Sequence, residues 1–117
     1  MIDVRFYADK KSGKISLEVK GHAGQAESGK DIVCSAASIL AYTVAQMVKY
    51  AYIDDQLKEI PKIELNEGDA IAIISCIPKK EFKNNIYHTY RVAQTGYHLL
   101  LHNYPEYVKL TSFVGLI

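Results

Sequence analysis

The sequence has 117 residues, of which 49% are hydrophobic and 23% are charged. This length suits one domain with its own hydrophobic core, so we expect a single domain over residues 1–117. The formal net charge of +1 argues against binding to nucleic acid or to anionic membranes through bulk charge. No apolar run approaches the roughly 20 residues of a membrane-spanning helix, and two cysteines give no disulfide framework and no zinc pattern. We therefore expect a cytoplasmic protein.

Five segments have the pattern of strands. Residues 2–9 and 15–20 alternate between apolar and polar side chains, which is typical of half-buried strands, and the turn between them predicts an antiparallel hairpin. A second pair is expected at residues 62–65 and 70–77, joined by a hairpin turn at 66–69. The second member of this pair is apolar on both faces, as in a central strand. A last strand is expected at residues 107–113.

Two long helices separate these strands. The first is predicted to begin near Asp31, a favoured N-cap residue, and to run to about residue 52. Its apolar residues at helical spacing are Val33, Ala37, Leu40, Val44, Met47 and Ala51. Ile32 and Ile39 fall outside this stripe, so we expect more than one face of the helix to be covered, by the sheet and by a second helix or a partner subunit.

The second helix is predicted over residues 80–103, with an apolar stripe at spacings of three and four. The resulting order of elements is ββαββαβ. This order predicts an α+β two-layer domain in which both long helices pack on a mixed β-sheet.

The segment between the second strand and the first helix carries the candidate chemistry. His22 follows the strand beside Gly21 and Gly24, and Cys34 is the third helical residue if Asp31 is the cap. A thiol attacks as its thiolate, and a helix N-terminus lowers the thiol pKa because its unpaired N–H groups favour negative charge. A neutral imidazole can take the thiol proton and return it to a leaving amine. This pattern predicts a cysteine nucleophile with a histidine base.

Structural interpretations of the same residues stay open. A single cysteine in an apolar helix is usually a core residue. Asp31 either caps the helix or orients His22 as a third catalytic member, and its charge opposes a low thiol pKa. Ser38 lies one turn after Cys34 on the same face and can hydrogen-bond near it. Cys76, in an apolar strand, is interpreted as a core residue.

Two competing motifs are weaker. Residues 24–31 match the phosphate-binding pattern G-x-x-x-x-G-K, but Asp31 stands where a Ser or Thr would hold magnesium. His98 and His102 are four residues apart and can share a helix face as metal ligands, but no third ligand is evident at helical spacing. A solvated helix end is the favoured interpretation of these two histidines.

The segments 21–24 and 29–38 together resemble the ribosomal-processing cysteine protease family, called Prp. The pattern combines Gly-His-Ala, a glycine-containing loop, Asp-Ile-Val-Cys and a serine one turn later. The matching positions are Gly21, His22, Ala23, Asp31, Val33, Cys34 and Ser38. The resemblance covers essentially the whole chain.

The resemblance implies a cysteine endopeptidase with Cys34 as nucleophile and His22 as general acid/base, without metal or cofactor. It further implies a mobile lid over residues 24–30, whose Gly24 and Gly29 allow motion, and a homodimer. The implied substrate is the N-terminal extension of large-subunit ribosomal protein twenty-seven, cut after Phe and before Ala. The alternative is a non-catalytic ribosome-associated binding protein with Cys34 in its core. Neither interpretation requires a membrane or direct contact with nucleic acid.

Overall fold

A five-stranded sheet forms one layer of the described structure. The computed structural model describes residues 1–21, 28–66 and 70–112, and only the backbone of residues 28–31. The strands are β1 (Ile2–Ala8), β2 (Ile15–Lys20), β3 (Lys62–Asn66), β4 (Ile71–Cys76) and β5 (Val108–Ser112), in the spatial order β3-β4-β2-β1-β5. All neighbouring strands pair antiparallel except β1 and β5, which pair parallel. The sheet is therefore mixed, and β4 occupies the internal position that its two apolar faces predict.

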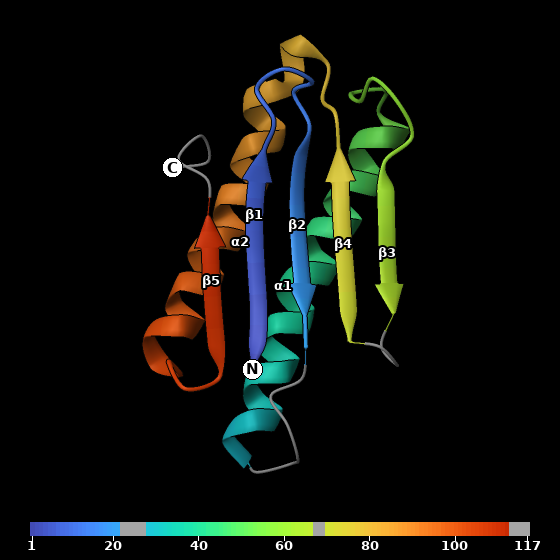
Figure 1. The fold of residues 1–117 in the computed structure, drawn as a ribbon. Helices are drawn as coiled ribbons and strands as arrows, with labels where there is room; N and C mark the ends of the chain where they lie inside the picture. The colour runs from blue at the N-terminus through green and yellow to red at the C-terminus, as the bar shows by residue number, and fades with distance from the viewer. Residues whose placement is uncertain (22–27, 67–69, 113–117) are drawn as a thin grey trace.

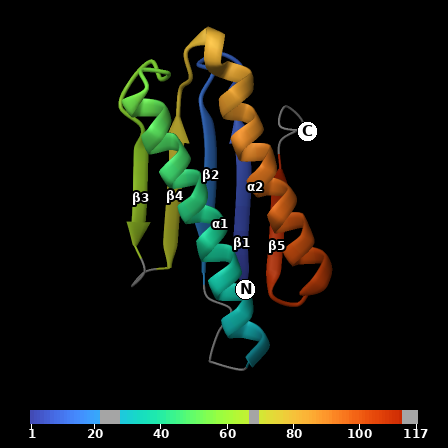
Figure 2. The ribbon, with the colours of Figure 1, turned by 180° about the vertical axis from the view of Figure 1, so that it is seen from behind.

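Two helices form the second layer. α1 spans Ser28–Ile53 and α2 spans Lys83–Asn103, with one turn of 3-10 helix, Lys80–Phe82, before α2. Figure 1 shows the sheet in front of both helices, and Figure 2 shows both helices in front of the sheet. The helices thus cover the same face, and the predicted α+β arrangement with the order ββαββαβ is confirmed.

The buried face of α1 is rotated relative to the predicted stripe. Met47 was expected in the core but is exposed, and Leu40 is only partly buried. Val33, Leu40 and Met47 are seven residues apart, and a seven-residue series drifts by about 20° per step around an ideal helix. By Met47 this drift has carried the side chain out of the interface. The buried residues of α1 are Val33, Ala37, Ala41, Val44, Ala45, Val48 and Ala51.

α1 is more apolar than we expected from the sequence, where no apolar run was judged long enough to span a membrane. Within the described residues, the segment Ile32–Ile53 is long and apolar enough to cross a membrane by length and composition alone. A core helix of a soluble protein passes the same test, and the inward face of α1 packs in the core formed with the sheet and α2. One such helix is therefore weak evidence for a membrane span.

Tyr97 ties α2 to the helix that carries Cys34. Its hydroxyl donates a hydrogen bond of 2.8 Å to the carbonyl oxygen of Ala37 in α1, and its ring meets Phe6 edge-on at 5.8 Å between ring centroids. Burial raises the pKa of Tyr97 well above its usual value, so the hydroxyl stays protonated and keeps this donor.

We expect Tyr97→Phe to lower the free energy of unfolding by about 1 kcal/mol, because it removes one buried hydrogen bond and keeps the ring. Urea denaturation measures this change. Tyr52→Phe, at an exposed tyrosine of α1, is the matched control and is expected to change the stability by less than about 0.5 kcal/mol. Equal effects of the two substitutions would contradict a stabilising role of the Tyr97 hydroxyl.

Candidate active site

Cys34 lies in the second turn of α1 and faces a pocket. The helix begins at Ser28, three residues before the predicted start, so Asp31 is inside the helix and is not its cap. Gly29, expected in a loop, is likewise the second residue of α1. Residues 28–30 extend the helix because each added residue contributes a further backbone hydrogen bond. Cys34 therefore lies one turn deeper in the helix than the sequence predicted.

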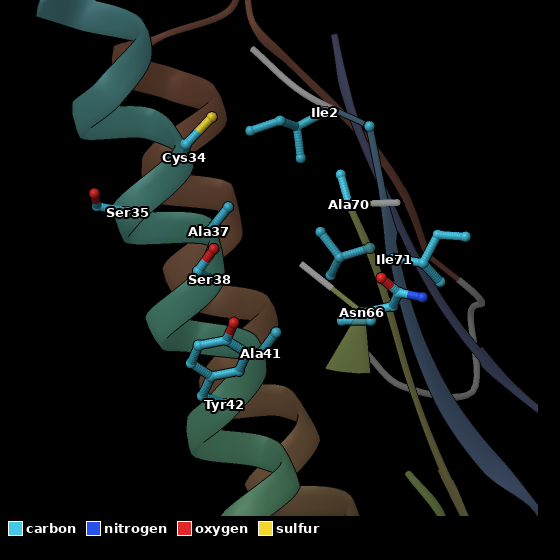
Figure 3. A pocket seen from close by; sticks show the side chains of 13 residues that line it. Ile2, Cys34, Ser35, Ala37, Ser38, Ala41, Tyr42, Asn66, Ala70 and Ile71 are labelled. Carbon is cyan, nitrogen blue, oxygen red and sulfur yellow. The ribbon is translucent and has the colours of Figure 1, made fainter. Parts of the chain in front are cut away.

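The pocket lies between α1 and one end of the sheet and has a volume of ≈ 360 Å³. This size is within the range of small-molecule and peptide side-chain sites. Figure 3 shows Cys34 and Ser38 pointing from α1 toward the sheet, whereas Ser35 points away from it. The described residues that line the pocket include no Asp, Glu, Lys, Arg or His. They are Ile2, Val19, Gly21, Cys34, Ser35, Ala37, Ser38, Ala41, Tyr42, Asn66, Ala70, Ile71 and Ala72.

The structure brings together three of the predicted site residues. Gly21, Cys34 and Ser38 line the same pocket, although Gly21 directly follows β2 and the other two come from α1. His22 and Gly24 lie outside the described residues, as does the side chain of Asp31. The pairing of His22 with Cys34 and the orienting role of Asp31 therefore stay predictions. The lid predicted over residues 24–30 stays a prediction for residues 24–27, whereas residues 28–30 are the start of α1.

Two lining residues were absent from the sequence-based site. Tyr42 follows Cys34 and Ser38 at spacings of four, so helical periodicity alone identifies it as a neighbour on the same flank of α1. Asn66 ends β3, and the pairing of β3 with β4 brings it to the pocket. No local sequence signal predicts the position of Asn66, because it depends on the order of the strands.

Cys76 is the second cysteine of the chain and has a different environment. Its side chain is buried in the core, with its Sγ 3.7 Å from the Tyr90 hydroxyl oxygen. Burial raises the pKa of the Cys76 thiol to about 11. Both observations agree with the expected core role, and they make Cys76 a poor nucleophile at neutral pH.

We expect iodoacetamide to modify Cys34 in the folded protein and to leave Cys76 unmodified between pH 6 and pH 9. At pH 8 a thiol of pKa about 11 is thiolate in only about one molecule in a thousand, and burial further excludes the reagent. Mass spectrometric peptide mapping at increasing pH measures both rates. In urea the two cysteines should react alike, which serves as the control. Equal rates in the folded protein would contradict the different environments of the two thiols.

The competing motifs gain no support from the described geometry. No three His, Cys, Asp or Glu side chains gather to hold a metal ion within the described residues. His98 and His102 are exposed on α2. The strand before the phosphate-binding pattern, β2, pairs antiparallel with both of its neighbours, whereas phosphate-binding loops of this type follow a strand of a βαβ unit.

The model of the cysteine protease Prp family matches residues 1–109. The chain belongs to the cysteine protease Prp family. The expected resemblance is thus confirmed, and the chain is a cysteine protease by its family. A search of curated protein sequences finds no match to it.

Solved structures similar to this Prp family member share its fold. SMU.848 from Streptococcus mutans is 26% identical over 97% of this chain and 94% of its own, with a TM-score of 0.71. The ribosomal processing protease Prp from S. aureus with a substrate peptide is 21% identical over 97% and 100%, with a TM-score of 0.71. The same protease with a covalently linked product peptide is 22% identical over the same shares, with a TM-score of 0.70.

Proposed function

We propose that Cys34 is the nucleophile of this protease and that His22 is its general acid/base. The observation that carries the proposal is the contrast between the two cysteines. Cys34 is partly exposed and lines a pocket, whereas Cys76 is buried with a raised pKa. A cysteine protease needs a thiolate within reach of a peptide carbonyl. Of the two cysteines, Cys34 is the one that a substrate reaches.

The proposed reaction passes through a thioester. His22 takes the proton from Cys34 Sγ, and the thiolate attacks the carbonyl carbon of the scissile bond. When the tetrahedral intermediate collapses, the C–N bond breaks and His22 gives the proton to the leaving amine. Water then attacks the thioester with His22 as base. The C–S bond then breaks, the carboxylic acid product leaves, and His22 returns the proton to Cys34 Sγ. No step requires a metal or a cofactor.

The proposed substrate is the N-terminal extension of large-subunit ribosomal protein twenty-seven, cut after Phe and before Ala. Two observations support it. A solved protease of the same family and fold is described as a ribosomal processing protease. The pocket beside Cys34 has apolar walls, which include Ile2, Val19 and Ala41, and such walls favour an aromatic side chain over a charged one.

The test is cleavage of a synthetic peptide that copies this extension, followed by mass spectrometry. We expect one cut, between Phe and Ala. A peptide with Asp in place of this Phe is the matched control and should lose at least about 99% of kcat/KM, because a buried, unpaired carboxylate is costly. If the wild-type protein cuts neither the peptide nor the intact ribosomal protein, the proposed substrate is wrong.

We further propose that the protease is a cytoplasmic homodimer that binds no nucleic acid directly. The near-neutral net charge supports the last point. The outward face of α1 supports the dimer, because Ile32, Ile39, Tyr50 and Ile53 are large apolar side chains left exposed opposite the core. Apolar side chains gathered on one exposed face are typical of a protein–protein interface.

We expect Ile39→Asp to weaken dimerisation at least about tenfold, because it buries a carboxylate in the proposed interface. Sedimentation equilibrium measures the dimer dissociation constant. Ile60→Asp, at an exposed isoleucine outside α1, should leave this constant unchanged. A monomeric wild-type protein at all concentrations, or equal effects of both variants, would exclude this face as the interface.

A further inference from the structure

The pocket extends from Cys34 along one flank of α1. Cys34, Ser38 and Tyr42 follow one another at spacings of four and all line it. Figure 3 shows Cys34 at one end of this row of α1 residues and Tyr42 at the other. Tyr42 comes eight positions after Cys34, which corresponds to about 12 Å along the helix axis at about 1.5 Å per residue. The pocket is therefore longer than one side chain needs.

The length of the pocket matches a short stretch of extended peptide. An extended chain rises about 3.3 Å per residue, so about 12 Å corresponds to between three and four residues. A peptide with its scissile carbonyl at Cys34 that continues into the pocket must run toward Tyr42. Its third or fourth residue from the cleaved bond then lies beside the Tyr42 ring.

The chemistry of the walls indicates which side of the bond enters the pocket. Its described lining is uncharged, and the residue proposed to precede the cut is phenylalanine. Apolar walls suit the side that carries this phenylalanine. At the far end, the half-buried Tyr42 adds an aromatic face, and Asn66 of β3 adds an amide. An aromatic face of this kind packs well against an aliphatic or aromatic side chain.

We propose that Tyr42 is a specificity-determining residue, which selects an apolar side chain at the third or fourth residue before the cleaved bond. The phenylalanine counts as the first of these residues. This proposal rests on the proposed function, because it requires a peptide substrate bound with its scissile carbonyl at Cys34. It adds a second recognition point to the pocket that holds the phenylalanine.

The test is a double-mutant cycle between the enzyme and its peptide. The host peptide contains the Phe–Ala bond, leucines at the third and fourth residues before the bond, and serines elsewhere. For the wild type, leucine to alanine at one of these positions should lower kcat/KM about tenfold or more, mainly through KM. For Tyr42→Ala, the same peptide change should lower kcat/KM by less than about twofold.

Two controls separate recognition from folding. A short peptide that begins at the second residue before the bond should be cut equally well by the wild type and by Tyr42→Ala. Tyr52→Ala alters an exposed tyrosine of the same helix that does not line the pocket, and it should keep the wild-type preference. If Tyr42→Ala does not fold, Tyr42→Lys replaces it. This variant should prefer glutamate over leucine at the selected position about tenfold more than the wild type does.

The outcomes distinguish the two proposals. If leucine to alanine at both positions lowers kcat/KM as much for Tyr42→Ala as for the wild type, the proposed role of Tyr42 is wrong. The proposed protease activity would not be affected by this result. Slower cutting of the short peptide by folded Tyr42→Ala would also overturn it, since the substitution would then disturb the reaction itself. If the wild type cuts none of the peptides, the proposed function fails, and the role of Tyr42 fails with it.

Discussion

Replacement of Cys34 by alanine is expected to abolish peptide cleavage. Removing the nucleophile of a protease lowers kcat by a factor of at least about 10⁴, because binding and electrostatic contacts alone supply only a small part of the full rate enhancement. His22→Ala should cause a loss of similar size, since an unassisted thiol transfers its proton poorly to the leaving amine. The double variant should be no worse than either single variant, because the two groups act as a unit. Initial rates of cleavage between Phe and Ala measure all three.

The matched control for this experiment is Cys76→Ala. This thiol lies in the core, away from the described pocket lining, so its loss should lower stability and leave kcat/KM within about twofold. Circular dichroism must show that each variant is folded. Loss of activity in Cys34→Ala with full activity in His22→Ala would keep the nucleophile and assign the base to another residue. Full activity in Cys34→Ala would contradict the proposed mechanism.

The fold was predictable because its elements have clear periodicities. Alternation of apolar and polar residues identifies β1 and β2. Apolar residues at spacings of three and four identify α2, in which Tyr90 and Tyr97 are completely buried. The start of α1 was not predictable from Asp31 alone, because a good cap residue also fits inside a helix. The exposure of Met47 was missed since a seven-residue spacing does not match the 3.6-residue helical turn.

Gly21 was predicted from the family motif, and local patterns alone predicted the site only where its residues are neighbours along the chain. Cys34 and Ser38 share a helix face by their spacing, and both line the pocket. The opposite wall depends on pairing between distant segments: the pairing of β2 with β4 brings Ala70 opposite Gly21, and that of β3 with β4 brings Asn66 there. These contacts follow from sheet order, which a local pattern does not contain.

Gly21 is a position where a single methyl group is expected to have a large effect. Its backbone φ is +98°, an angle that residues with a side chain rarely adopt. An added Cβ would also overlap the carbonyl oxygen of Met1. The Gly21 N–H also donates a hydrogen bond of 3.0 Å to the Ala70 carbonyl, so the backbone cannot shift without breaking this contact. Both neighbours are main-chain atoms, and neither can move aside as a flexible side chain would.

We therefore expect Gly21→Ala to lower the free energy of unfolding by about 2–5 kcal/mol. Backbone strain accounts for about 1–2 kcal/mol and the overlap for a further 1–3 kcal/mol. The control is Gly13→Ala, at φ +77°, where the added Cβ would meet only Ile77 Cγ2 at 4.0 Å, an ordinary contact. In Gly13→Ala, the free energy of unfolding should fall only by the contribution of backbone strain. Urea denaturation of both variants separates the two components, and equal losses would show that the Met1 carbonyl yields to the methyl group.

The same substitution tests how the pocket depends on this turn. Gly21 lines the pocket with Cys34 and directly precedes His22 in the chain, so a shift of its backbone moves one wall of the site. Catalysis responds strongly to small misplacements of reacting groups. We expect Gly21→Ala to lower kcat/KM at least about 100-fold under conditions where the variant stays folded, whereas Gly13→Ala, far from this wall in the β1–β2 turn, keeps the wild-type rate. Wild-type kcat/KM in folded Gly21→Ala would limit the role of this glycine to stability.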